Sequence, residues 1–139
     1  MIAAAILVWG LVAGLFHSVA MVVLYGNPRV ARIHAAHDKP TAAPRSERSG
    51  RHNFTIQFLG TQIEVYVMTI GYVWLHPLLP LNGLLGAILL AVLFAVLRVC
   101  GPVWALWMQR TYSYRYLLVE IVGGVLGSIV VALTLYVLM

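Results

Sequence analysis

Four ionisable side chains of this chain lie inside long apolar stretches, where charge is costly. They are His17, Glu64, Arg98 and Glu120. An unpaired Arg near the centre of a membrane helix costs about 2.5 to 3.5 kcal/mol, so such residues are usually paired and often functional. The chemistry open to this group is proton transfer, with His17 as the group most able to titrate near neutrality, or the binding of an anion or small polar ligand. A structural role, in which the charges fix helix register and orientation, is the alternative.

The spacing of these residues predicts one buried polar cluster. Gln57, Thr61 and Glu64 are separated by four and three residues, which places them on one helical face. At a rise of about 1.5 Å per residue, the four ionisable groups lie roughly 9 to 16 Å from the inner ends of their helices. Glu64 then matches Arg98 in depth and can pair with its guanidinium, with Glu120 as a second candidate partner. The predicted cluster consists of His17, Gln57, Thr61, Glu64, Arg98 and Glu120.

A proline follows Arg98 by one helical turn. Pro102 has no N–H, so it cannot donate to the carbonyl of Arg98. We therefore predict a helix kink at Pro102 and an unbonded carbonyl beside the charge.

Composition identifies the elements that must position these residues. The 139 residues are 62% apolar and 9% charged, and the mean hydropathy is +0.92, as in an integral membrane protein. Apolar runs cover about 2–25, 54–75, 83–108 and 115–138, each long enough for a crossing of roughly 20 residues. A basic loop, 26–53, which begins as a short interfacial helix at Pro28, follows the first run, and the other connections are short. The predicted fold is one all-α transmembrane domain, 1–139, built as a four-helix antiparallel bundle.

The basic residues predict the orientation of the chain. Arg and Lys concentrate in the loop 26–53 and beside the third connection, whereas the second connection and both tails have none. Because basic loops stay on the cytoplasmic side, the first and third loops are expected there and both termini on the opposite side. The net charge of +5 predicts attraction of the lipid bilayer's anionic inner-leaflet headgroups. No nucleic-acid-binding module is visible, and no nucleic acid is expected as a partner.

Small residues at helical spacing predict where the helices approach one another. In lipid, close contact through Gly, Ala and Ser drives helix association. The predicted packing positions are Gly10, Gly14, Ser18, Ala91, Ala95, Gly123 and Gly127. Four short helices enclose little volume, so we also expect a homo-oligomer or a larger membrane complex.

No metal site or cofactor is predicted. His34 and His37 stand three apart beside Asp38, but no third ligand supports a metal site in this loop. Cys100 is the single cysteine, so no intrachain disulfide can form. His17 is the only deep histidine, which disfavours a haem held by two histidines. No catalytic residue can be assigned, and the residues favour a protein that is not an enzyme.

Two stretches resemble a bacterial family of uncharacterised four-helix membrane proteins, a domain of unknown function. They are VVLYGNPRVARIHAAH at the end of the first run and YRYLLVEIVGGVLGSIV in the last one. Leu24 stands where that family usually has Trp. The resemblance implies a location in the bacterial inner membrane and no known activity.

The stretch SERSGRHNF is similar to a region of the membrane-associated eicosanoid and glutathione metabolism proteins. That resemblance implies that Arg48, Arg51, Asn53 and Arg98 approach a glutathione-like anion, although Ala105 stands where the family's third helix has Tyr. Two functions therefore remain open. One is a small inner-membrane protein whose polar cluster serves transport or proton movement, or a subunit of a membrane assembly. The other is a glutathione-dependent membrane transferase.

Overall fold

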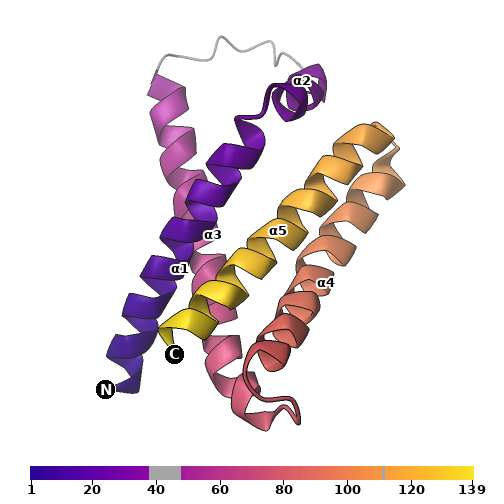
Figure 1. Cartoon of the computed structure of the whole chain (residues 1–139). Coiled ribbons are helices and arrows are strands. Elements are labelled where there is room, and N and C mark those ends of the chain that lie inside the picture. Colours follow the sequence, from indigo (N-terminus) through magenta and orange to yellow (C-terminus); the bar gives the residue numbers. More distant parts are fainter. Residues whose placement is uncertain (38–47, 111) are drawn as a thin grey trace.

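The computed structural model describes residues 1–37, 48–110 and 112–139, and every regular element in these ranges is helical. The elements are α1 (Ile2–Tyr25), α2 (Pro28–His37), α3 (Arg48–Leu75), the one-turn 3₁₀ helix η1 (His76–Leu78), α4 (Leu84–Gln109) and α5 (Tyr114–Leu138) (Figure 1). The predicted all-α class is confirmed.

Three of the described helices, α1, α4 and α5, are long and apolar enough to cross a membrane. Their outward faces carry exposed large apolar side chains, for example Leu7 on α1, Leu97 on α4 and Val122 on α5. A water-soluble monomer rarely exposes so much continuous apolar surface. The chain is therefore a small membrane protein. α3 is long enough to cross a membrane and is continuous. Its apolar sequence is interrupted by Gln62 and Glu64, which lower its mean hydropathy.

The helix bounds agree with three of the four predicted runs to within a residue and differ for the second. α3 begins at Arg48 instead of residue 54, whereas the short helix predicted to begin at Pro28 is present as the ten-residue helix α2. The physical reason is that an apolar run indicates where lipid contact begins, whereas a backbone can stay helical through polar residues beyond it. α2 starts where Pro28 supplies a preset φ and Asn27 Oδ1 accepts a hydrogen bond from Arg29 N at 3.0 Å.

The helices pack in a particular set of pairs. α4 and α5 lie side by side along most of their length, and α1 packs against both α5 and α3. α3 touches α4 and α5 much less than it touches α1. Both termini lie at one end of the molecule, and α2 lies at the other end with the turn between α4 and α5 (Figure 1).

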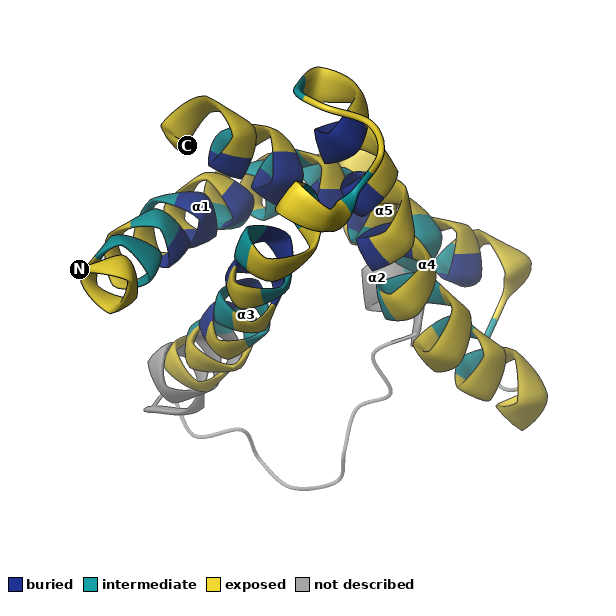
Figure 2. Ribbon diagram, turned by 90° about the horizontal axis from the view of Figure 1, so that it is seen from below, coloured by how far each residue is buried: buried dark blue, intermediate teal, exposed yellow. Residues whose placement is uncertain are grey.

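The core lies where α1, α3, α4 and α5 face one another. Buried positions line the inward faces of these helices, and exposed positions cover the outside (Figure 2). The completely or almost completely buried side chains include Ala13, Val65, Tyr72, Leu90, Val131 and Leu135. Among the residues whose side chains the structure describes, the polar or ionisable ones buried with them are His17, Gln62, Thr69 and Ser128.

Candidate functional site

The guanidinium of Arg98, near the middle of α4, is bound to the carboxylate of Glu64 on α3. Arg98 Nε donates to Glu64 Oε1 at 2.7 Å, and Arg98 Nη2 donates to Glu64 Oε2 at 3.1 Å. Two parallel bonds of this kind match the planar fork of Arg to the two oxygens of a carboxylate. The pairing that depth counting predicts is present in the structure.

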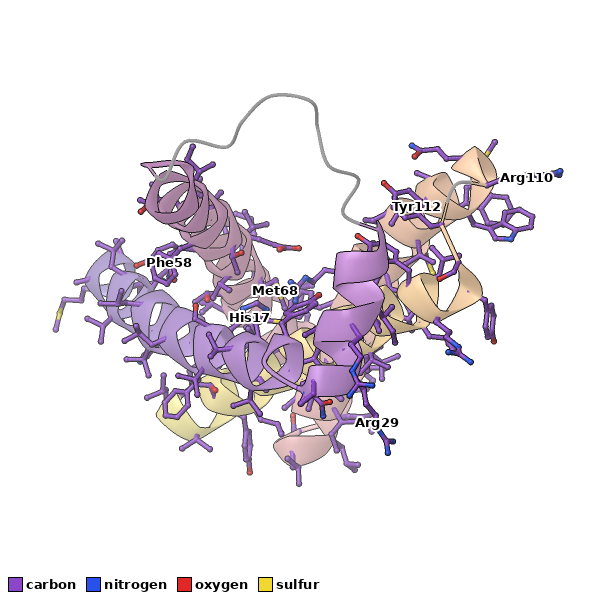
Figure 3. All side chains as sticks on the ribbon, turned by 90° about the horizontal axis from the view of Figure 1, so that it is seen from above. His17, Arg29, Phe58, Met68, Arg110 and Tyr112 are labelled. Atoms are coloured by element: carbon purple, nitrogen blue, oxygen red, sulfur yellow. The ribbon has the colours of Figure 1, made fainter. Side chains whose placement is uncertain are left out.

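His17 of α1 is the third member of this site. Its side chain points from α1 toward the centre of the molecule (Figure 3), where only 2% of it is exposed. Its Nε2 atom lies 3.4 Å from Arg98 Nη2. Because a guanidinium has only donors, Nε2 must accept, and the ring proton is then on Nδ1. We call Arg98, Glu64 and His17 the Arg98 cluster.

Helix α5 contributes a glycine at the level of the Arg98 cluster. A Cβ atom on Gly127 of α5 would lie 2.5 Å from His17 Nε2 and 2.9 Å from Arg98 Nη1. No real Cβ comes so close to its neighbours without displacing them. Gly127 therefore lets α5 close over the His17 ring and the Arg98 guanidinium.

The Arg98 cluster is not internally satisfied. Within the described residues, Arg98 Nη1 and His17 Nδ1 are buried and have no hydrogen-bond partner. The Arg98 side chain is 15% exposed, whereas that of Glu64 is 44% exposed. The Arg98 cluster thus combines two buried donor atoms with an accessible carboxylate. The two donors can bind an additional acceptor such as water.

The remaining predicted cluster residues lie elsewhere or outside the description. Glu120 is seven residues from Gly127, about 10 Å along α5, and lies within electrostatic reach of Tyr25. Thr61 is half-buried one turn before Glu64 on α3. The side chain of Gln57 is outside the described residues. The structure thus joins His17, Glu64 and Arg98, while α5 reaches their level with Gly127.

Two polar residues that the prediction missed connect α3 to α1. Gln62 Nε2 donates to the carbonyl of Gly10 at 2.9 Å, and Tyr66 Oη donates to the carbonyl of Leu7 at 3.0 Å. A Cβ at Gly10 would collide with the Tyr66 ring, and one at Gly14 would collide with the Gln62 amide. The signal was available, because Gln62 and Tyr66 are four apart, as Gly10 and Gly14 are, and the two pairs can face each other.

Replacing Gln62 with leucine is expected to loosen the contact between α1 and α3. The change removes the bond to Gly10 and also the buried Oε1 atom, which has no partner among the described residues. Because bonds between membrane helices are worth about 0.6 kcal/mol on average, the expected loss is small. Thermal unfolding in detergent should show a slightly lower midpoint for Gln62→Leu. A midpoint reduced as much as by loss of Glu64 would contradict this interpretation.

The other predicted packing residues are distributed over several contacts. Gly123 lies against Tyr25, where an added Cβ would be 3.1 Å from the hydroxyl oxygen. Ala91 and Ala95 are buried on α4, and Ser18 is half-buried on α1. Gly124, which was not among the predicted positions, brings α5 against Val99 of α4.

Pro102 lies inside α4, which continues through it to Gln109. Since Pro has no N–H, the carbonyl of Arg98 lacks its usual helical donor. That carbonyl is an additional acceptor close to the Arg98 cluster.

No group of three His, Cys, Asp or Glu side chains among the described residues could hold a metal ion. The side chains of His34, His37 and Asp38 lie outside the description. The same is true of Arg48, Arg51 and Asn53, which the resemblance to the glutathione metabolism proteins implicates, so of that set only Arg98 can be placed.

Comparison with known proteins finds no match among protein-family models, curated proteins or solved structures.

Proposed function

We propose that this chain is a multi-pass protein of the bacterial inner membrane in which four helices, α3 included, cross the bilayer as an antiparallel bundle. The bond between Glu64 and Arg98 supports the crossing of α3, because it places α3 beside the middle of an apolar helix. Arg29, Arg32, Arg110 and Arg115 support an orientation in which the α2 end faces the cytoplasm and both termini face away.

Within this arrangement, the Arg98 cluster is proposed to move protons. The exposure of Glu64 carries the proposal. Its carboxylate is bound to Arg98 near the middle of α4, yet 44% of the Glu64 side chain is exposed. An exposed carboxylate is costly in hydrocarbon, so it requires water or a polar neighbour at that depth. Water that reaches Glu64 can deliver a proton to it and remove one.

The chemistry needs one proton and no covalent step. When a proton binds to Glu64, the carboxylate becomes a neutral acid, so its ion pair with Arg98 is lost and the hydrogen bonds between the two side chains weaken. Arg98 keeps its charge, because a guanidinium is not deprotonated in proteins, and its N–H groups then turn to other acceptors such as water. Release of the proton restores the pair. The cluster therefore has two states that differ by one proton, as proton-coupled transport requires.

Proton flux into sealed liposomes tests this function. The purified protein is reconstituted with a pH-sensitive dye inside, and a potassium gradient with valinomycin sets the membrane potential. Wild-type vesicles should acidify faster than protein-free vesicles. Glu64→Gln preserves the shape of the side chain and one acceptor for Arg98 but cannot bind a proton, so its flux should fall to that of protein-free vesicles.

Glu120→Gln is the matched control, because it makes the same chemical change on α5 at a different level of the molecule. Its flux should stay close to that of the wild type. The proposed function is wrong if wild-type and protein-free vesicles acidify equally, or if Glu64→Gln elutes as the wild type on size exclusion and still conducts.

A further inference from the structure

A second polar site lies on α3 toward the end of the molecule that holds the termini. Tyr72 is 1% exposed, and its hydroxyl has no hydrogen-bond partner among the described residues. Its ring stacks on that of His76, with ring centroids 5.0 Å apart and planes 16° apart. A buried hydroxyl without a partner is unusual and calls for water or a transient acceptor. We call Tyr72 and His76 the outer pair.

His76 is held at the turn that leads into α4. Its Nε2 atom lies 3.4 Å from the carbonyl of Gly83, and a Cβ at Gly86 would come within 3.3 Å of the same nitrogen. The His76 residue is half-buried, between the buried Tyr72 ring and the turn that leads into α4. His76 therefore lies where a proton can pass between the interior and the water at this end.

The outer pair continues a row of side chains that begins at Glu64. Glu64, Met68 and Tyr72 follow one another at spacings of four along α3, and His76, the first residue of η1, stacks on Tyr72. Along this row Glu64 and Tyr72 are about 12 Å apart. Met68 lies between them along the helix and is 4% exposed. Its unbranched thioether fills the space without a strong polar atom and can move between rotamers.

We propose that the outer pair is the exit of the proton route that begins at Glu64, with Met68 as the apolar barrier between them. This inference rests on the proposed proton movement and adds the residues that complete the path. When the Met68 side chain moves, water connects Glu64 to the Tyr72 hydroxyl. That hydroxyl gives its proton to water beside the His76 ring and takes one from the Glu64 side. His76 binds the proton at a ring nitrogen and releases it to the outer solution.

The surroundings of the outer pair fit this role. The titratable group near it from a neighbouring helix is Tyr136 of α5, which lies within electrostatic reach of Tyr72. α4 and the preceding turn offer His76 the carbonyl of Gly83, which can accept but cannot titrate. His76, whose ring nitrogens can bind a proton, is therefore the next titratable group beyond Tyr72.

The same liposome assay tests the exit with variants of α3. Tyr72→Phe keeps the stacked ring but removes the hydroxyl, and His76→Gln keeps a donor for Gly83 but cannot carry a proton at neutral pH. Both should lose the wild-type flux. Tyr66→Phe is the matched control, because it removes a hydroxyl on the same helix that is bonded to α1 instead. Its flux should be retained. Met68→Ala opens the barrier and should conduct faster than the wild type.

The assay distinguishes a failure of the proposed exit from a failure of the proposed proton movement. If Glu64→Gln abolishes flux while Tyr72→Phe and His76→Gln conduct as the wild type does, the outer pair is not the exit and the proposed function stands. If wild-type and Met68→Ala vesicles both acidify like protein-free ones, the proposed function fails and the exit with it. Size exclusion of every variant identifies any that fails to fold. If one of Tyr72→Phe and His76→Gln fails to fold, the other tests the exit.

Discussion

Replacing Glu64 with leucine is expected to destabilise the protein by about 3 kcal/mol, the insertion cost of an uncompensated Arg at the centre of a membrane helix. The change removes both acceptors of the Arg98 guanidinium and leaves the charge in an apolar interior. The protein should accumulate poorly in membranes, and the surviving fraction should unfold at a clearly lower temperature in detergent.

The double variant Glu64→Leu with Arg98→Leu tests the cause of that loss. It removes the charge together with its partner, so it should recover most of the stability that Glu64→Leu alone loses. Leu97→Ala provides a baseline, because Leu97 is 66% exposed on the outer face of α4. Membrane accumulation of Glu64→Leu equal to that of Leu97→Ala would contradict the pairing, as would a double variant no better than the single one.

Replacing Gly127 with alanine is the second change for which a large effect is expected. The added methyl would enter the space that the His17 ring and the Arg98 guanidinium occupy. Overpacking of a tight contact costs about 1 to 3 kcal/mol. The displaced guanidinium also loses alignment with Glu64, so proton flux should decrease together with stability.

Gly60→Ala is the matched control for this substitution. Gly60 lies on α3 with open space around its missing side chain. Since Ala is favoured over Gly inside a helix by up to about 1 kcal/mol, Gly60→Ala should leave stability unchanged or raise it. The two substitutions are expected to change stability in opposite directions, so their thermal midpoints distinguish a tight contact from a general effect of adding a methyl group. Thermal midpoints that shift equally for both variants would show that Gly127 has no special contact.

The pair of Glu64 and Arg98 could be predicted from the sequence. The rise per residue of a helix is constant, so the number of residues from the helix end gives the depth of each side chain. Apolar runs similarly predicted α1, α4 and α5 almost to the residue. The start of α3 was not predictable in this way, since polar residues outside a bilayer can extend a helix without any change in hydropathy pattern.

Which residues meet across helices depends on how far each helix is shifted along its axis and on its rotation about that axis, and spacing within one helix leaves both undetermined. Glu120 and Gly127 lie on the same helix, and depth counting favoured the charged residue, whereas the structure places the glycine beside Arg98. The connection between Gln62 and Gly10 depends on the same relative placement of helices, so the matching spacings of the two pairs permit the contact without specifying it.

The separation of 34 residues between Glu64 and Arg98 has a consequence for biosynthesis. Translation delivers α3, the helix with the weakest tendency to enter lipid, before α4, which carries the charge that α3 must neutralise. α3 is a poor substrate for insertion alone, whereas α4 is strongly apolar apart from Arg98, so the two are expected to leave the translocon as a hairpin. A chain truncated after Leu75 would then leave α3 at the membrane surface or in solution, even though its residues are unchanged.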